Sequence, residues 1–519
     1  MESIVGFGMN ILAPCVSWIA GGIQRCRSRE ACVGRFLALA AVVLIAGCMV
    51  GPDFHRPAAP AVNGYTPEAL SPQTTSADVA GGEAQSFIQG LDLPGQWWTL
   101  FHSEPLNTLI DQALKANPNV QAAQAALRVA VENVNAQKGA FYPTVEASFS
   151  PSRQKNAVGT LAPTLSSGSP IFNLYAAQVS VFYMLDVFGT NRRQVETLEA
   201  LAESQRFQLE ATYLTLTSNV VAATVQEASL RGQIAATQEV INIESEQLNL
   251  LRRLFELGAI AEANVVAQEA ALAQTQATLP PLQKQLAQQR NLLTALLGRF
   301  PSEEPAEKFE LSTLQLPQDL PVSLPSKLVE QRPDVRSAEE QLHAASAQVG
   351  VATANMLPQF ILSANVGSVA TQIGQLFAAG NNFWGAAGNV TQPIFEGGTL
   401  LHKRRAAEAA YDQVAAQYRS TVITAFQNVA DTLRALQYDA NALKAALAAE
   451  RAAAESLDIA RRQLQLGDIS YLSLLNAEQT YQQAVILLVQ AQANRYTDTV
   501  ALFQALGGGW WNRSNLAHN

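Results

Sequence analysis

The chain has 519 residues, a formal net charge of −9, 48% hydrophobic residues and only 15% charged residues, where soluble domains average about 25%. The acidic balance excludes a strongly basic nucleic-acid-binding protein, and the apolar content excludes an acidic disordered chain. Four cysteines in a chain of this length exclude a disulfide scaffold.

The first feature in chain order is an apolar run at residues 36–50, shorter than the roughly 20 residues of a membrane-spanning helix. Four arginines precede it and Pro52 follows, a pattern typical of a secretory signal. Its end, Ile45-Ala46-Gly47-Cys48, resembles a bacterial lipobox. We therefore predict that residues 1–47 are removed and that Cys48 carries covalent lipid, with no other cofactor. Residues 1–24 are a leader extension, translation upstream of the true start, or a first membrane helix.

Removal of the leader changes the charge and the thiol inventory. Residues 1–47 hold four arginines and two glutamates, a net +2, so the mature chain is at −11. Cys48 is then the remaining cysteine, which excludes an intrachain disulfide. Met49 follows it, where an Asp would resemble an inner-membrane retention signal. The lipid anchor is therefore expected in the outer membrane, on a segment 48–105 that precedes the main fold.

The mature chain repeats itself, which indicates a tandem duplication. Two marker prolines recur 215 residues later and two glycines recur 209 residues later: Pro118 with Pro333, Pro143 with Pro358, Gly258 with Gly467, and Gly298 with Gly507. We predict repeats at 106–300 and 327–507, a linker at 301–326 and a tail at 508–519.

Each repeat is predicted to contain a helix, a β-hairpin, a long helix and a return helix. In chain order these are 106–140, 144–187, 190–256 and 260–297, then 327–356, 360–394, 400–466 and 469–506. Pro280-Pro281 is expected to bend the first return helix. The second long helix carries apolar residues in strict 4-3 spacing, which predicts a coiled-coil seam: Val422, Phe426, Val429, Leu433, Leu436, Ala440, Leu443 and Leu447.

The strand segments alternate apolar and polar residues, as Val145, Ala147 and Phe149 do in the first. Segments of about ten residues with one apolar face suit a transmembrane β-barrel, and a strand on a soluble sheet is the alternative. Four strands cannot close a barrel, which needs roughly eight, and an open edge is not tolerated in lipid. A membrane barrel therefore requires several copies, eight strands in a dimer or twelve in a trimer.

The order of these features resembles the TolC-like outer-membrane efflux channels, in the lipoprotein branch that serves resistance–nodulation–division pumps. The matching residues are Cys48 with Gly51-Pro52-Asp53-Phe54 and Pro57, Trp97-Trp98 with Phe101, Leu185-Asp186-Val187-Phe188-Gly189 before Arg192-Arg193, Phe395-Glu396-Gly397-Gly398, Arg253-Leu254 with Gly258, and Leu297-Gly298. The resemblance implies an α+β membrane protein and a homotrimer. Its α-helical coiled-coil barrel would extend into the periplasm and continue into a 12-stranded β-barrel in outer-membrane lipid.

The resemblance also implies the outlet of a tripartite system, with a periplasmic adaptor protein and an inner-membrane pump as partners. The exported cargo would be small molecules and drugs. Type I secretion, metal-cation efflux and a non-channel lipid-anchored coiled-coil protein are the alternatives. Neither nucleic-acid binding nor catalysis is expected, since the five histidines are scattered and no metal or nucleophile motif is present.

The resemblance places function at the two turns that follow the long helices. It implies adaptor docking at Arg253, Leu254 and Gly258 and at Arg462, Leu464 and Gly467, where capping and packing is the alternative reading. It implies a periplasmic aperture at Asp468, Leu472, Ser473 and Asn476. Family members often carry Asp at the last two positions, so a charged ring here depends on Asp468.

Basic residues begin both long helices, at Arg192-Arg193 and at Lys403-Arg404-Arg405. Near a membrane they could meet anionic lipid groups at the inner leaflet of the outer membrane. Solvated helix starts are the alternative.

Overall fold

The computed structural model describes residues 49–155 and 171–513. The predicted leader and Cys48 lie outside these residues. The described chain divides into two compact units. The sheet unit holds residues 49–52, 137–155, 171–195 and 347–407, and the helical unit holds 53–136, 196–346 and 408–513. Each is considered by itself.

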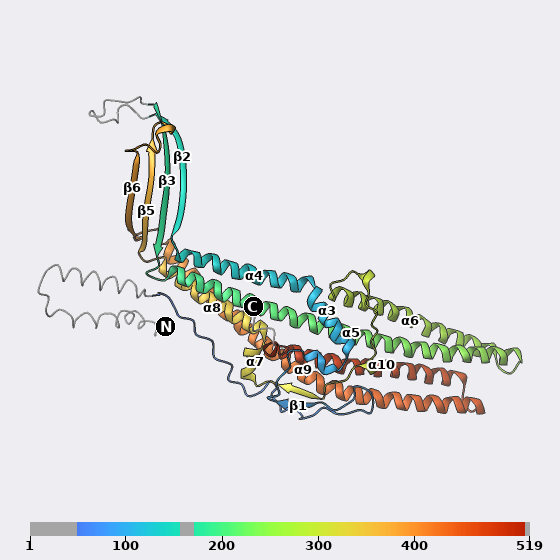
Figure 1. Ribbon diagram of the computed structural model, residues 1–519. Helices are drawn as coiled ribbons and strands as arrows, with labels where there is room; N and C mark the ends of the chain where they lie inside the picture. The colour runs from blue at the N-terminus through green and yellow to red at the C-terminus, as the bar shows by residue number, and fades with distance from the viewer. Residues whose placement is uncertain (1–48, 156–170, 514–519) are drawn as a thin grey trace. The chain divides into compact units, whose positions relative to one another are not determined.

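The sheet unit contains one four-stranded antiparallel sheet in the order β2-β3-β5-β6 (Figure 1). Its strands are β2 Thr144–Lys155, β3 Ile171–Leu185, β5 Gln359–Ala370 and β6 Asn382–Thr391. Each predicted hairpin is present, and the two pair through β3 and β5. Each repeat therefore supplies half of the sheet.

The register gives this sheet one apolar face along all four strands. Val179 of β3 pairs with Ala147 of β2 and Val366 of β5, and Val366 pairs with Trp384 of β6. Successive side chains alternate between the two faces, so every second residue along a strand shares the face of these pairs. Its other apolar residues are Val145, Phe149, Tyr175, Ala177, Val181, Tyr183, Leu185, Phe360, Leu362, Ala364, Ala386 and Val390.

The opposite face of the sheet is polar around Gln178 and Ser180 and carries the apolar residues Phe182, Met184 and Ile361 nearer one end. Gln178 pairs with Ser148, and Ser180 pairs with Glu146 and Asn365. In the described residues β2 pairs with β3 alone and β6 with β5 alone, so both outer strands have a free edge. The sheet is therefore two-faced and open at both sides within a single chain.

Eight α-helices are present in the described chain, four from each repeat. They are α3 Glu104–Ala116, α4 Pro118–Lys138, α5 Thr190–Glu256 and α6 Glu262–Leu296, then α7 Pro325–Gln331, α8 Pro333–Ala354, α9 Thr399–Leu466 and α10 Tyr471–Ala505. Short 3-10 turns lie at Trp97–Phe101, Gly139–Phe141, Pro301–Glu303, Leu311–Thr313, Ile373–Gln375 and Trp510–Asn512. No helix among the described residues has the length and apolar character to cross a membrane.

The predicted first helix of each repeat is wrong in one respect, because each is two helices. Asn117 separates α3 from α4 and Arg332 separates α7 from α8, both in extended backbone. Each precedes a proline, whose ring disfavours helical backbone in the preceding residue. Pro280 and Pro281, at which a bend is expected, lie inside α6, and the helix continues through both of them.

The predicted heptad seam of α9 is confirmed as a buried stripe. Leu433, Leu436, Ala440 and Leu443 have no exposed surface, and Phe426 packs against the main core. That core also contains an aromatic cluster of Trp97, Phe101, Tyr496 and Phe503. A parallel pair that the sequence did not predict, β1 Ser86–Gln89 with β4 Asp319–Val322, lies in the same helical unit.

The duplication is visible in matched contacts where the return helices end. The Asn117 side-chain amide donates to the Leu296 carbonyl (2.9 Å), and the Arg332 guanidinium donates to the Ala505 carbonyl (3.1 Å). Donors and acceptors stand at equivalent positions of the two repeats. In both repeats, therefore, an equivalent backbone carbonyl at the end of the return helix accepts a hydrogen bond, from Asn117 in the first repeat and from Arg332 in the second.

Candidate functional site

The two turns after the long helices have the same cap. After α5, the Gly258 N–H donates to the Phe255 carbonyl (2.8 Å) and the Ala259 N–H to the Leu254 carbonyl (2.8 Å). After α9, Gly467 donates to Leu464 (3.1 Å) and Asp468 to Gln463 (2.9 Å). Both pairs are the Schellman pattern, which places its C′ residue in left-handed backbone. Gly258 and Gly467 have φ of 73° and 80°, so glycine relieves strain at both turns.

The residues expected at these turns lie mainly on the surface. Arg253, Gly258, Arg462 and Gly467 are exposed, and Leu254 is half-buried. Arg462 pairs with Asp458 one turn earlier on α9. Leu464 packs against a small core at the tip, so for this residue packing is observed directly.

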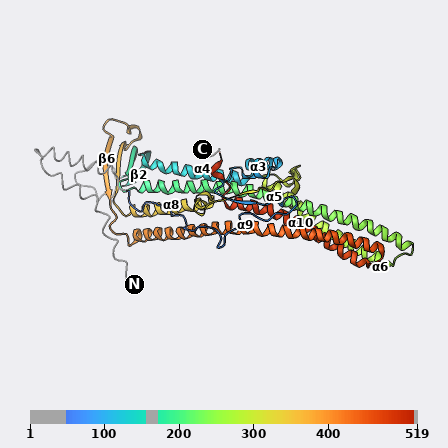
Figure 2. The same cartoon turned by 90° about the horizontal axis from the view of Figure 1, so that it is seen from below.

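That core joins the end of the α5–α6 pair to the end of the α9–α10 pair. The two ends lie side by side in Figure 1 and in Figure 2. Its buried members are Leu248, Leu251, Val265, Leu457, Ala460, Tyr471 and Leu474. We call this end of the helical unit the tip.

The first turns of α10 have a buried face and an exposed face. Tyr471 and Leu474 are buried, whereas Leu472 is 64% exposed and Asn476 is also exposed. Ser470 caps the helix by accepting from the Ser473 N–H (3.3 Å). Leu472, Ser473 and Asn476 thus share the exposed side of α10, whose other side packs in the tip core, and Asp468 is exposed at the turn before this helix.

The tip also holds a buried polar cluster that sequence reasoning missed. Glu244 of α5 and Glu478 of α10 are each 4% exposed, and Gln268 of α6 has no exposed surface. The Glu478 carboxyl accepts from the Gln247 side-chain amide, and the Tyr471 hydroxyl donates to Gln268. No sequence motif marks this cluster, since its members are ordinary helix-surface residue types from three helices.

Backbone and hydroxyl contacts complete the cluster. The Gln268 amide donates to the backbone carbonyl of Glu244 (2.9 Å), and the Thr275 hydroxyl donates to its Oε1 (3.0 Å). Burial raises the pKa of both carboxyls: at Glu244 the Thr275 hydroxyl opposes this, and at Glu478 the Gln247 amide and the Arg461 guanidinium do. Burial also raises the pKa of Tyr471, with help from the two carboxylates.

In the sheet unit, the basic pair at the start of α5 does not behave as a lipid-facing patch. Arg193 is buried and donates to the carbonyls of Val50 (3.1 Å) and Gly51 (3.4 Å). Arg192 is paired with Asp186 (3.2 Å). The prediction of lipid contact is therefore wrong for Arg193, because the backbone carbonyls of Val50 and Gly51 take its donors, while residues 403–405 are exposed.

Arg193 instead fixes the residues that follow Cys48. The Val50 N–H donates to the Phe188 carbonyl (3.2 Å). Met49 packs closely against Gly189, since a Cβ added to Gly189 would lie 2.8 Å from the Met49 side chain. Residues 49–51 are thus held against the end of β3 and the start of α5.

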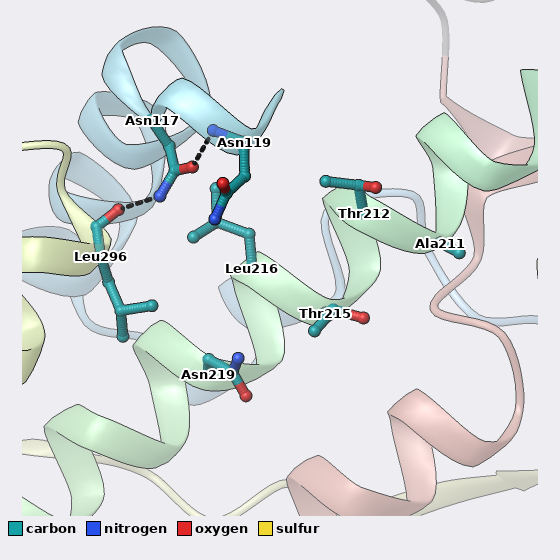
Figure 3. Close-up of a pocket in the computed structure, with 8 residues that line it drawn as sticks. All are labelled: Asn117, Asn119, Ala211, Thr212, Thr215, Leu216, Asn219 and Leu296. Carbon is teal, nitrogen blue, oxygen red and sulfur yellow. Dashed lines mark hydrogen bonds between the residues drawn. The ribbon is translucent and has the colours of Figure 1, made fainter. Parts of the chain in front are cut away.

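An open groove of about 270 Å³ lies in the helical unit beside the break between α3 and α4 (Figure 3). It is lined by Asn117, Asn119, Ala211, Thr212, Thr215, Leu216, Asn219 and Leu296. None of these side chains titrates near neutral pH. The described residues also contain no group of three His, Cys, Asp or Glu side chains that could hold a metal ion.

Comparison with known proteins bears directly on this geometry. A family described as "Outer membrane efflux protein" matches residues 109–299 and 324–508, nearly the span of the two repeats. The chain belongs to this family. The toluene efflux pump outer membrane protein TtgC of Pseudomonas putida is 31% identical over 484 residues, which cover 93% of this chain and 96% of TtgC.

Two further similarities extend the result. The probable outer membrane lipoprotein SilC of Salmonella typhimurium is 27% identical, over 92% of this chain and 99% of SilC. The structure of the outer-membrane channel OprN superposes with a TM-score of 0.79 at 26% identity, over 89% of this chain and 100% of that one. The predicted mixed helical and β fold, the outer-membrane location and the efflux function are confirmed, and the family is one of channels.

Proposed function

We propose that three copies of this chain close one β-barrel of twelve strands in the outer membrane. The two free edges of the sheet, β2 and β6, support this, because an unpaired edge in lipid leaves backbone groups without partners. The face through Val179 and Val366 would contact lipid, and the face through Gln178 and Ser180 would line the aqueous channel. This two-faced, open-edged sheet is the observation that carries the proposal.

The tip would form the periplasmic aperture. Leu472 would supply an apolar ring around the three-fold axis, and Ser473 and Asn476 would supply uncharged polar groups beside it. Asp468, which is exposed at the turn, would be the acidic group of the ring. The exposure of these side chains on a helix fixed from behind by Tyr471 supports this arrangement.

The two turns would dock a periplasmic adaptor that connects to an inner-membrane pump. Arg253, Leu254 and Gly258 would form the first contact, and Arg462, Leu464 and Gly467 the second. Their shared cap geometry supports this, because a trimer would present six turns of equal shape to the adaptor.

Cys48 would carry the lipid anchor. It lies outside the described residues, one position before a segment that Arg193 and Phe188 hold in place. SilC is named a lipoprotein, and two or more acyl chains give a stable anchor where one is marginal. The cargo would be small organic molecules, as the name of TtgC indicates for that protein.

Single-channel recording in planar bilayers tests the aperture. Leu472→Ala and Asn476→Ala should each raise the leak conductance, while Thr480→Ala, exposed one turn further along α10, should leave it unchanged. Unchanged conductance in both aperture variants contradicts the assignment. Native mass spectrometry of the detergent-solubilised protein tests the trimer, and a dimer or monomer mass refutes it.

A further inference from the structure

The duplication has placed one Arg–Glu pair twice at the tip. Arg252 and Glu269 lie 2.7 Å apart in the first repeat, and Arg461 and Glu478 lie 4.0 Å apart in the second, both members displaced by the repeat interval of 209. The first pair is a surface pair, with side chains 52% and 45% exposed. In the second pair the Glu478 side chain is 4% exposed. The glutamate of this pair is therefore solvated in the first repeat and buried in the second, where the Arg461 side chain stays 38% exposed.

Residues without a counterpart in the other repeat bury Glu478. The positions equivalent to Glu244 and Gln268 hold Ala453 and Ala477, and the position equivalent to Tyr471 holds Glu262. In the second repeat Tyr471 binds Gln268 of α6, and Gln247 of α5 binds Glu478. The contacts that enclose this carboxyl thus come from the opposite helix pair.

The enclosed site does not satisfy two ionised carboxylates. The Oε2 atoms of Glu244 and Glu478 are buried without a hydrogen-bond partner, and so is Nη2 of Arg461. The groups facing the pair are Arg461 from α9, Tyr471 from α10, and the neutral Gln247, Gln268 and Thr275 from α5 and α6. One distant guanidinium faces two carboxyls, so ionising both leaves a buried negative charge.

We propose that Glu478 and Glu244 form a proton-dependent latch between the two helix pairs of each chain, closed while the carboxyls are neutral and loosened when they ionise. The latch acts on the aperture through α10. Glu478 and Tyr471 are on the buried face of the turns whose exposed face carries Leu472 and Asn476. Glu478 is a positioning residue here, and this regulatory role rests on the proposed aperture.

The direction of the pH effect follows from the raised pKa of both carboxyls in the closed tip. A carboxyl whose pKa is higher when latched stabilises the latch fully at pH below the ordinary carboxyl range. That stabilisation is lost as the pH rises through the raised value. Acid therefore closes the tip and neutral or alkaline medium loosens it.

Hydrogen exchange of the full mature protein in detergent, at pH 4 and pH 8, tests the latch without relying on transport. Variants are compared at the same pH, which removes the intrinsic dependence of exchange on pH. At pH 8, amides in 471–480 of the wild type should exchange about tenfold faster than in Glu478→Gln, because the neutral glutamine side chain cannot ionise and keeps the latch closed. At pH 4, below the ordinary carboxyl range, the two should agree. Glu269→Gln, the solvated twin, should match the wild type at both pH values.

Equal exchange of wild type and Glu478→Gln at pH 8 overturns the latch, and so does an equal effect from Glu269→Gln. Glu244→Gln provides a second variant, expected to protect the same amides at pH 8. Bilayer conductance separates the two proposals. Exchange that follows the expected pattern while conductance ignores both pH and Leu472→Ala keeps the latch and refutes the aperture. Conductance that responds to Leu472→Ala, with exchange identical in all variants, keeps the aperture and refutes the latch.

Discussion

Replacing Val179 by Lys tests which face of the sheet meets lipid. Val179 lies on β3 between Ala147 and Val366, which share its face. The apolar face of β3 runs from Tyr175 to Leu185. The ten residue-to-residue steps between them, at about 3.4 Å each and tilted about 40°, span about 26 Å along the membrane normal, close to the roughly 25 Å apolar band of outer-membrane barrels.

The position of Val179 in this band sets the cost of a charge. It is four residues from Tyr175 and six from Leu185, so it lies about 10 Å and about 16 Å from the two ends by the same geometry. Lys near the midplane costs about 2–4 kcal/mol. At about 1.4 kcal/mol per factor of ten, the folded, inserted population should fall roughly 30- to 900-fold relative to the unfolded one.

The matched control is the adjacent residue on the other face. Gln178 pairs with Ser148 and faces the proposed channel, so Gln178→Lys should change the insertion free energy by less than about 1 kcal/mol. Urea titration of folding into phosphatidylcholine vesicles measures both variants. An equal loss in the two variants, or a larger loss for Gln178→Lys, would refute the assignment of faces.

Three further predictions concern the helical unit and the anchor. Leu433→Ala should lower the unfolding free energy by about 2–5 kcal/mol because its side chain is fully buried, while the exposed Gln427→Ala should change it by less than about 0.5 kcal/mol; urea denaturation measures both. Gly467→Ala should cost about 1 kcal/mol from its φ of 80° alone, since a Cβ there meets nothing within 4 Å, and thermal unfolding at matched concentration checks it. Arg193→Ala should release residues 49–51, seen as faster hydrogen exchange of the Val50 amide; unchanged exchange would show that Phe188 suffices.

Much of this fold could be predicted because its signals are periodic. The 4-3 spacing of α9 indicates a buried stripe whatever the partner is, and the stripe is buried. The apolar–polar alternation of β3 predicts its two faces, and the register confirms them because its apolar residues pair with apolar residues of β2 and β5 such as Ala147 and Val366. The helix breaks at Asn117 and Arg332 were missed although both precede proline, because the apolar periodicity continues across them.

Single polar residues were harder to predict than periodic ones. Arg193 and Glu478 are charged residues of the kind that a sequence predicts on the solvated face of a helix. Both are buried by contacts with segments far away in the sequence. Arg193 meets Val50, 143 residues earlier, and Glu478 meets Gln247, 231 residues earlier. A local pattern holds no information about partners at that separation. The functional consequence of both residues therefore depends on the structure.

Duplication followed by local divergence explains why the two repeats can perform different tasks on one scaffold. At the ends of the return helices, the backbone carbonyls of Leu296 and Ala505 occupy equivalent positions and each accepts a side-chain hydrogen bond. Where they differ, a short Asn117 stands in place of Arg332 beside an open groove. At the tip, surface residue Glu269 corresponds to buried Glu478. Because helices and caps are duplicated intact, these side-chain differences suffice to place one buried, titratable contact between the two helix pairs behind the proposed aperture, while the equivalent pair Arg252 and Glu269 stays on the surface.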